Sequence, residues 1–349
     1  MTTMSGVPRN PGKTARPTMR DVAARAGVSL KTVSRVLNGE PAVHPKTRDR
    51  VLGAATALGF RRNDIAASLR RIGQSMETIG VVIEDVANPF YGGVLRGVEE
   101  VTRARGYLLI TASSDEDPAL ERETLSAFLS RRVDGLIVVP AGTDHSYLAA
   151  DMAQGTALVF ADRPARGLDA DCVLGDNESA AAAAVRHLHE YGHRRIGFVG
   201  DDPDLYTAQE RFRGYRAELR RAKIPLDRSL VRQGVRNVDA AYAAADDLIG
   251  IADPPTAILT GNNRSTIGTV RRLRQHDRAL ALVGFDDFEL ADVLDPPVTV
   301  VTHDARSLGR AAAQRLLARL DGDTSPPRTI RLPATLIERG SGEIERVAG

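Results

Sequence analysis

The sequence predicts a small all-α head and a short hinge helix, followed by a two-lobed α/β core of parallel, doubly wound sheets. At 349 residues the chain is too long for one ordinary hydrophobic core, so two or three domains are expected. Three short amphipathic helical patterns stand near the start of the chain. From Ile79 onward, apolar runs alternate with helical patterns, which is typical of parallel α/β architecture. The length of this second region indicates two similar lobes.

The composition, with 42% hydrophobic and 26% charged residues, is that of a soluble globular protein. No apolar run approaches the ~20 residues that a bilayer span requires. The start, "MTTMSGVPRN", has no apolar stretch of the kind found in secretory signals, so we expect a cytoplasmic protein. The single cysteine, Cys172, excludes an internal disulfide framework and is expected to be a buried thiol.

The charge of the chain is unevenly distributed, although the net charge is only +2. Residues 1–72 contain 14 Lys and Arg against 4 Asp and Glu, whereas the remainder contains 33 against 41. A basic N-terminal fifth points to nucleic acid as a partner. Residues 1–17, which include Gly, Pro and three basic residues, are expected to form a disordered basic arm.

The first two helices are predicted from their capping residues. Thr18 can serve as the N-cap of the first helix, with Asp21 completing a capping box, and Gly27 ends it. Ser29 can cap a second helix over residues 30–37.

A third helix is predicted over residues 45–58, so that residues 18–62 share one core and form the head. Asn63 can cap a further helix, 64–71, within a hinge and linker of residues 63–75. This helix has little apolar surface and needs a partner to become ordered.

The first two helices have the dimensions of a helix-turn-helix, in which the second helix lies in the major groove of DNA. Lys31 and Arg35 are one turn apart on one face, and their donors suit guanine or phosphate, while Leu30 can meet a thymine methyl. The alternative for such a pattern is an ordinary helical hairpin with a solvated basic face.

Seven apolar runs in the core region have the length and composition of buried strands. They are "TIGVVIEDV", "YLLITASS", "DGLIVVPAG", "ALVFAD", "RIGFVGDD", "TAILTGN" and "ALALVGFDD". Open α/β sheets bind ligands at the carboxyl ends of their strands, so the residues that follow these runs are candidates for a binding site.

These residues carry a resemblance to a known family. The stretch "TMRDVAARAGVSLKTVSRVLNG" resembles the DNA-binding head of the LacI/GalR family of bacterial transcription regulators. The resemblance continues through "NPFYGGVLRGVEE", "RRVDGLIVVP", "HLHEYGHRRIGFVG", "VGFDD" and "LPATLIERGS", and covers all but the first 17 residues.

The resemblance implies a periplasmic-binding-protein-like core over residues 76–349, used for effector binding and dimerisation. Its two lobes are expected at about 76–162 with 303–325, and 176–290 with 332–345. Three crossings between the lobes are expected near residues 162–176, 290–303 and 325–332.

The resemblance also implies the positions that contact DNA. In the head these are Thr18, Ser29, Leu30, Lys31, Thr32, Arg35, Asn38 and His44. In the hinge they are Asn63, Ala66, Leu69 and Arg70. Leu69 occupies the position of a leucine that wedges into the minor groove, and the resulting bend lets both heads of a dimer bind. The hinge helix is therefore expected to form fully only on operator DNA.

Candidate effector-binding residues follow the predicted strands, and the resemblance places the family's effector site at the same positions. They are Phe90, Tyr91, Asp162, Arg163, Arg211, Asn262 and Asp286. An aromatic face with carboxylate, amide and guanidinium groups suits a polyhydroxylated ring, so a sugar or sugar derivative is expected as the effector. Taken singly, each of these residues also fits a structural role as a cap, a loop ion pair or a core aromatic.

Several positions depart from the family pattern. Asn263 replaces the usual Asp and removes a carboxylate, and Leu205 stands where purine-responsive members have an arginine, which argues against a purine effector. The stretch "TVVTHDA" replaces the family's usual "TTVxxP", a change for which the sequence offers no physical reason.

The sequence contains one enzyme-like motif. "HEYGH", residues 189–193, fits the H-E-x-x-H zinc pattern, but Gly192 is expected to end the helix before His193. No set of nucleophile, base and orienting group is evident. We therefore expect no enzyme activity, no catalytic residues, no metal and no cofactor.

The sequence as a whole predicts a sequence-specific transcription regulator, a repressor of carbohydrate-related genes that binds a near-palindromic operator as a homodimer and responds to a small molecule. Two-fold symmetry of the protein would match that of the operator. One alternative is a regulator of the same fold that is controlled by a protein partner or has lost its response to small molecules. A periplasmic sugar-binding protein is disfavoured by the basic head and the absence of a signal sequence.

Overall fold

The computed structural model describes residues 17–37, 40, 43–60, 77–275 and 280–345. The chain divides into a head, which extends to Met76, and a core from Glu77 onward. Among the described residues, no helix combines the length and the apolar character needed to cross a membrane.

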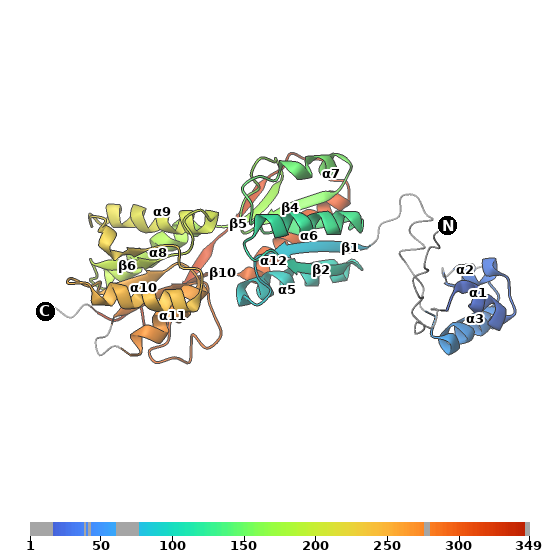
Figure 1. The fold of residues 1–349 in the computed structure, drawn as a ribbon, viewed down its shortest axis with the longest axis horizontal. Helices are drawn as coiled ribbons and strands as arrows, with labels where there is room; N and C mark the ends of the chain where they lie inside the picture. Colours follow the sequence, from blue (N-terminus) through green and yellow to red (C-terminus); the bar gives the residue numbers. More distant parts are fainter. Residues whose placement is uncertain (1–16, 38–39, 41–42, 61–76, 276–279, 346–349) are drawn as a thin grey trace, which may run out of the picture. The chain divides into compact units, whose positions relative to one another are not determined.

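The head contains three helices, as predicted (Figure 1). They are α1 (Met19–Ala26), α2 (Leu30–Leu37) and α3 (Pro45–Leu58). The predicted capping box is confirmed, because the Thr18 amide donates to Asp21 Oδ2 at 2.7 Å and the Asp21 amide donates back to Thr18 Oγ1 at 3.4 Å. Gly27 ends α1 with φ of 59°, in the left-handed region that glycine tolerates best. Ser29 Oγ accepts the amide proton of Thr32 at 3.2 Å and so caps α2.

The three helices share one small hydrophobic core, also as predicted. Its fully buried members are Val22, Ala23, Ala26, Val33, Val36, Val51, Ala54 and Ala55. Because these side chains use the inward faces of all three helices, the polar residues of α2 remain on the outside of the head. The expected hinge helix and residues 1–16 of the expected arm lie outside the described residues.

The first lobe of the core is built on a six-stranded sheet with the order β11-β5-β4-β3-β1-β2. The strands are β1 (Thr78–Ile83), β2 (Leu108–Ser113), β3 (Gly135–Val138), β4 (Ala157–Ala161), β5 (Asp171–Gly175) and β11 (Thr329–Leu332). Its helices are α5 (Pro89–Ala104), α6 (Pro118–Ser130), α7 (Ala149–Ala153) and α12 (Ala305–Leu320), with a 3₁₀ turn, η1 (Ser146–Leu148). All of its strand pairs are parallel.

The second lobe repeats this plan with the order β12-β10-β9-β8-β6-β7. The strands are β6 (Ile196–Val199), β7 (Val231–Arg232), β8 (Ala257–Thr260), β9 (Ala281–Phe285), β10 (Thr299–His303) and β12 (Ala334–Ile337). Its helices are α8 (Asn177–Glu190), α9 (Tyr206–Arg221), α10 (Val238–Gly250) and α11 (Asn263–Leu273), with a 3₁₀ turn, η2 (Arg228–Leu230). β12 pairs antiparallel with β10, whereas the other pairs are parallel.

The predicted crossings between the lobes were too broad. The range 162–176 contains β5, 290–303 contains β10, and 325–332 contains β11, each of which is a full member of a sheet. The chain instead crosses between β5 and α8, between β10 and α12, and between β11 and β12. The ranges expected for the first lobe, 76–162 and 303–325, therefore omit two of its strands.

Helix α12 belongs to the first lobe although it follows most of the second lobe in sequence (Figure 1). It packs backbone to backbone against α5, because a Cβ at Gly309 would collide with the carbonyl oxygen of Val94 and one at Gly97 with that of Arg306. The same packing recurs in the second lobe, where Gly214 of α9 lies against the carbonyl oxygen of Glu178 on α8. These contacts hold the helices close to the sheets whose carboxyl ends carry the candidate site.

Candidate functional site

The outer face of α2 has the properties of a nucleic-acid interface. Leu30, Lys31 and Arg35 are exposed, and Leu30 keeps 42% of its surface accessible although it is a large apolar side chain. Arg35 Nε lies 3.4 Å from Glu40 Oε2 in an exposed ion pair, which contributes little to stability and can open readily. The head thus presents donors for base edges or phosphates beside an apolar contact for a methyl group.

Of the remaining DNA-contact candidates, four lie within the described residues and the others lie outside them. Thr18, Ser29 and Thr32 lie at the N-termini of α1 and α2, and their side chains already take part in capping hydrogen bonds. His44 precedes α3, is exposed and makes no side-chain capping bond. The others lie outside the described residues: Asn38, Asn63, Ala66, Leu69 and Arg70.

In the core, two aspartates occupy equivalent places in the two lobes. Asp162 follows β4 with φ of 65°, and Asp286 follows β9 with φ of 61°. Each donates its amide proton to a neighbouring strand at 2.8 Å, Asp162 to the carbonyl of Val173 and Asp286 to that of Val301. Both side chains are buried, with 5% of each residue exposed. A left-handed non-glycine residue costs on the order of 1 kcal/mol, and such strain concentrates at functional sites.

The first lobe surrounds Asp162 with polar partners. Tyr91 donates its hydroxyl proton to Asp162 Oδ2 at 3.2 Å, and burial together with the Asp162 charge raises the pKa of Tyr91 well above its usual value. Arg163 donates to both Glu116 oxygens, at 2.7 and 2.5 Å, and to the carbonyl of Pro140 at 2.9 Å. Phe90 is partly buried and meets Tyr91 edge to face, with ring centroids 5.2 Å apart.

The second lobe holds Asp286 beside Arg211. The Arg211 guanidinium lies over the Phe285 ring at 3.8 Å and places Nη2 3.4 Å from Asp286 Oδ2. Its Nε donates to Asn177 Oδ1 at 2.8 Å, which fixes its orientation. Asp286 Oδ1 is buried without a hydrogen-bond partner, and burial raises the pKa of Asp286 to about 6. An orphaned buried carboxylate oxygen is costly, so it marks a place where a ligand donor would be stabilising.

Asn262 has a more structural position than its sequence context suggested. Its Oδ1 accepts the amide proton of Ser265 at 2.7 Å and caps α11, and its Nδ2 donates to Asp201 Oδ2 at 2.6 Å. The amide group is therefore already engaged by the second lobe. The predicted residues form two groups, one on each lobe.

Five residues that the sequence reasoning did not assign to the site join the lobes. Asn263 Nδ2 donates to Asn88 Oδ1 at 2.9 Å, and Arg264 Nη1 donates to Glu84 Oε1 at 3.0 Å. Arg264 also pairs with Asp85. The departure at position 263 thus has a physical reason, because an amide can donate to Asn88 whereas a carboxylate cannot. Arg264 stands just after the predicted strand "TAILTGN", and Glu84 lies at the carboxyl end of the predicted run "TIGVVIEDV", directly after β1 as the structure has it; these positions are the signal that could have found them.

The unexplained histidine of "TVVTHDA" lies at the crossing between β10 and α12. His303 is buried, and burial, with a contribution from the Arg211 charge, lowers its pKa to about 4. Its ring packs against Gly175 so closely that a Cβ there would lie 2.6 Å from Nε2. His303 Nε2 is a second buried atom of this region without a hydrogen-bond partner.

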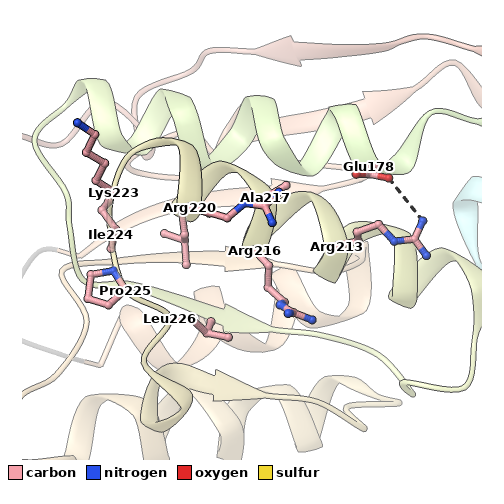
Figure 2. A pocket seen from close by; sticks show the side chains of 10 residues that line it. Glu178, Arg213, Arg216, Ala217, Arg220, Lys223, Ile224, Pro225 and Leu226 are labelled. Carbon is pink, nitrogen blue, oxygen red and sulfur yellow. Dashed lines mark hydrogen bonds and ion pairs between the residues drawn. The ribbon is translucent and has the colours of Figure 1, made fainter.

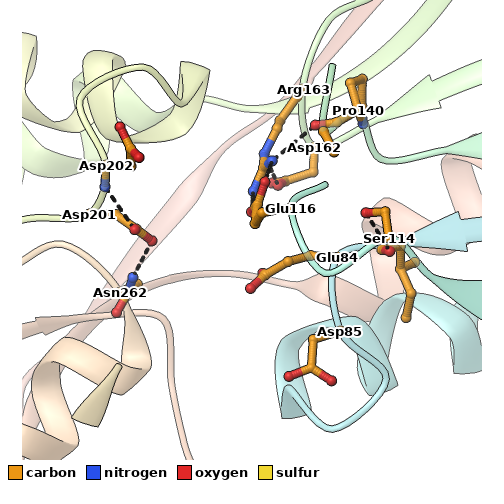
Figure 3. A network of polar contacts seen from close by, with 12 residues as sticks. Glu84, Asp85, Ser114, Glu116, Pro140, Asp162, Arg163, Asp201, Asp202 and Asn262 are labelled. Atoms are coloured by element: carbon orange, nitrogen blue, oxygen red, sulfur yellow. Dashed lines mark hydrogen bonds and ion pairs between the residues drawn. The ribbon is translucent and has the colours of Figure 1, made fainter. Parts of the chain in front are cut away.

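The carboxyl ends of both sheets therefore face one another across the core. Figure 3 shows Glu84, Glu116, Asp162 and Arg163 of the first lobe opposite Asp201 and Asn262 of the second. Ligands of open α/β sheets bind in this position.

A separate hollow of about 770 Å³ lies on the second lobe, along α9 (Figure 2). Cations line it, together with a short apolar segment and Glu178: Arg213, Arg216, Ala217, Leu219, Arg220, Lys223, Ile224, Pro225 and Leu226. None of the predicted site residues belongs to it.

In the zinc-like motif, the helix ends before His193, as predicted. Helix α8 ends at Glu190, and Gly192 has φ of 88°, so His193 leaves the helix. Both ring nitrogens of His193 are engaged, Nδ1 with Thr256 Oγ1 at 2.9 Å and Nε2 with the carbonyl of Ile344 at 2.8 Å. Among the described residues, no group of three or more His, Cys, Asp or Glu is arranged to hold a metal ion.

Comparisons with known proteins find a family match for the head and another for the core. Residues 18–63 match a family model described as bacterial regulatory proteins, lacI family. Residues 185–342 match a model described as a periplasmic binding protein-like domain. A curated relative, the HTH-type transcriptional regulator CelR of Thermobifida fusca, is 32% identical over 340 residues, which cover 94% of this chain and 98% of CelR.

Two solved structures extend the similarity to the whole fold. The lac repressor dimer bound to operator and the anti-inducer ONPF is 26% identical, with a TM-score of 0.82, over 93% of this chain and 99% of that one. The complex of the transcriptional regulator CelR with cellobiose is 29% identical, with a TM-score of 0.69, over 93% of this chain and 100% of that one. These similar proteins are regulators and not enzymes.

Proposed function

The chain belongs to the lacI family of bacterial regulatory proteins, and on this basis we propose that it is a ligand-responsive repressor of carbohydrate-related genes. It acts in the cytoplasm as a homodimer, reads a near-palindromic operator with its two heads, and binds a polyhydroxylated small molecule between the lobes of its core. The single observation that carries the ligand response is the facing pair Asp162 and Asp286, one from each lobe.

The paired aspartates support a ligand that bridges the lobes. Asp286 Oδ1 has no partner, and Tyr91 and Arg163 orient Asp162 from the other side. Hydroxyl groups of a ring can donate to both carboxylates, while Phe90 covers an apolar ring face. Because such a ligand interacts with both lobes only in one arrangement, it shifts the equilibrium between arrangements and thereby the affinity for DNA. The complex of CelR with cellobiose supports a sugar as the ligand class.

The DNA-binding role rests on α2. Lys31 and Arg35 supply donors for base edges, Leu30 meets a thymine methyl, and the capped N-termini of α1 and α2 lie near phosphates. In the hinge, Asn63, Ala66, Leu69 and Arg70 complete the contact in the minor groove. The lac repressor dimer bound to operator supports this arrangement of heads.

Exposed apolar side chains support a homodimer. Leu108 and Ile110 on the edge strand β2 are 71% and 38% exposed, and Leu290 and Val293 in the second lobe are 64% and 68% exposed. Large apolar groups gathered on the surface are typical of protein interfaces. A two-fold dimer built on them would match the symmetry of a palindromic site.

The test is selection of binding sites from random DNA with the purified protein at a stated salt concentration, repeated with a panel of sugars. An enriched palindrome whose recovery changes with one sugar is the expected result. A palindrome that is indifferent to every sugar would favour the alternative, control by a protein partner or no response to small molecules. The absence of an enriched site would contradict DNA recognition itself.

A further inference from the structure

We propose that the ligand bound between the lobes is a cation, a polyhydroxylated ring that carries an amino or imino group, with its ammonium among Glu84, Glu116 and Asp201. This inference rests on the proposed function and specifies its ligand class. It follows from the charges that the two lobes bring together, from an orphaned buried carboxylate, and from the residues that are available to neutralise them.

The facing surfaces of the lobes hold more carboxylates than guanidinium groups. The carboxylates are Glu84, Asp85, Glu116, Asp162, Asp201, Asp202 and Asp286. The guanidinium groups are Arg163, Arg211, Arg236 and Arg264. The only lysine of the core sequence, Lys223, lines the separate hollow on α9. The protein therefore contributes no ammonium group of its own to this site.

The four guanidinium groups are already paired with carboxylates, and three carboxylate charges of this region remain without a guanidinium to balance them. Arg163 is committed to Glu116 and lies 3.8 Å from Asp162 Oδ2, while Arg264 is divided between Glu84 and Asp85. Asp201 receives hydrogen bonds from the neutral Asn262 amide at 2.6 Å and the Asp202 backbone at 2.8 Å. Arg163 and Arg236 attract it from a distance, but among the described residues no ion pair joins a cation to it. A neutral donor satisfies the lone pairs of a carboxylate but leaves its charge unbalanced.

The orphaned oxygen of Asp286 points to a ligand independently of this charge count. Asp286 is 95% buried, its Oδ1 has no partner, and its carboxylate faces Asp162 of the other lobe, whose charge adds to the effect of burial on its pKa. Two buried carboxylates that face one another across a binding site are stabilised by a ligand that supplies donors to both. In the proposed complex, hydroxyl groups of the ligand ring donate hydrogen bonds to Asp162 and Asp286.

The ammonium is assigned to the neighbouring carboxylates because these repel one another. Figure 3 shows Glu84 of the first lobe directed toward Asp201 and Asn262 of the second, with Glu116 on the same side of the first lobe beside Arg163. Burial and then the Glu116 charge raise the pKa of Glu84 to about 7, and burial raises the pKa of Asp201. A ligand cation placed between them would replace repulsion across the lobes with attraction to both lobes.

A metal ion suits this place less well than an organic cation. Within the part of the chain that the structure describes, no three of these groups lie close enough to coordinate one ion. An ammonium attached to a ring needs a hydrogen bond to only one or two of these carboxylates, because the other contacts of the ring hold it in place. The geometry therefore favours a cationic sugar-like molecule over a bare divalent cation.

The experiment measures binding of matched pairs of probes to the full-length protein by isothermal titration calorimetry. The pairs are D-glucosamine and D-glucose, D-galactosamine and D-galactose, and 1,4-dideoxy-1,4-imino-D-ribitol and D-ribose. In at least one pair the cationic member is expected to bind at least tenfold more tightly than the neutral one. Operator affinity is measured with every probe in parallel.

Variants show whether the preference for a cation comes from the assigned carboxylates. Asp201→Asn is expected to reduce the preference to less than threefold. Asp204→Asn, the same change at an exposed position of the same loop, is the matched control and keeps the preference. Glu84→Gln provides a second variant in case Asp201→Asn does not fold.

The outcomes separate this inference from the proposed function. Tighter binding of a neutral sugar than of its cationic partner, with an effect on operator affinity, overturns the cation assignment and leaves the proposed function intact. A cation preference that survives both Asp201→Asn and Glu84→Gln overturns the assignment to these residues. If no probe binds and none changes operator affinity, the cation assignment is overturned and the ligand response is contradicted as well.

Discussion

Replacing Glu84 with glutamine is expected to remove a specific dependence of stability on pH. Burial and the neighbouring Glu116 raise the pKa of Glu84 in the folded protein from an ordinary 4.5 to about 7. Between these two values the folded protein keeps a proton that the unfolded chain has lost, so unfolding releases a proton. The free energy of unfolding of the unliganded protein therefore falls as the pH rises from about 4.5 to 7.

The magnitude follows from the size of this change in pKa. At 1.36 kcal/mol for each pH unit, the stability lost to ionised Glu84 is about 3 kcal/mol by pH 8. Glu84→Gln cannot ionise at this position and does not lose this stability. The difference in unfolding free energy, Glu84→Gln minus wild type, is expected to grow by about 3 kcal/mol between pH 4 and pH 8. Asp286, whose pKa is raised to about 6, contributes a similar slope to both proteins and cancels in the difference.

The measurement is urea unfolding at several pH values, followed by far-ultraviolet circular dichroism because the chain contains no tryptophan. The matched control is Glu123→Gln, the same change at an exposed position of α6 in the same lobe. Parallel pH profiles for wild type and Glu84→Gln would refute the argument, since they would mean that Glu84 ionises normally in the folded protein.

Three further predictions concern the DNA interface, the helix packing and the dimer. Arg35→Ala is expected to weaken operator binding by at least ~1 kcal/mol, about fivefold, if the side chain contacts a base, and an unchanged affinity in a gel-shift titration would remove that role. Gly309→Ala places a methyl group against the carbonyl of Val94 and should cost about 1–3 kcal/mol of stability. Gly92→Ala on α5, where a Cβ meets nothing within 4 Å, is the control and should not have this cost. Equal melting curves for the two variants would argue against close packing of α5 on α12. Leu108→Glu introduces a charge on the exposed edge of the first lobe and should raise the dimer dissociation constant about tenfold or more in analytical ultracentrifugation, and an unaltered constant would place the dimer interface elsewhere.

The features predicted correctly from sequence are those that depend on short stretches of chain. The capping box at Thr18, the glycine that ends α1, and the seven hydrophobic strands are each encoded within ten residues or so, and the structure confirms them. Strands β5, β7, β10, β11 and β12 were missed. Of these, β7 has only two residues, and β11 and β12 become strands through pairing with partners far away in sequence, which no local pattern records.

In the candidate site too, locally encoded features could be predicted from sequence, whereas contacts between distant residues could not. Asp162 and Asp286 could be located because each follows a strongly apolar strand. The bridges from Arg264 to Glu84 and from Asn263 to Asn88 join positions more than 170 residues apart, and they depend on how the two lobes meet. The position of Asn262 after a predicted strand favours a ligand contact, yet its amide caps α11 and binds Asp201. Sequence position locates a residue at the edge of a sheet, and only the packing of the lobes decides its partner.

The packing of α12 on α5 has a consequence for synthesis of the protein on the ribosome. The head depends on contacts within residues 18–60 and can fold as soon as it leaves the exit tunnel. The first lobe is different, because α5 and the sheet lack their cover until α12, which begins at Ala305, has been made. By then nearly all of the second lobe has been translated. The two lobes therefore complete their cores almost together, and a chain that is cut before α12 leaves the apolar face of α5 open to aggregation.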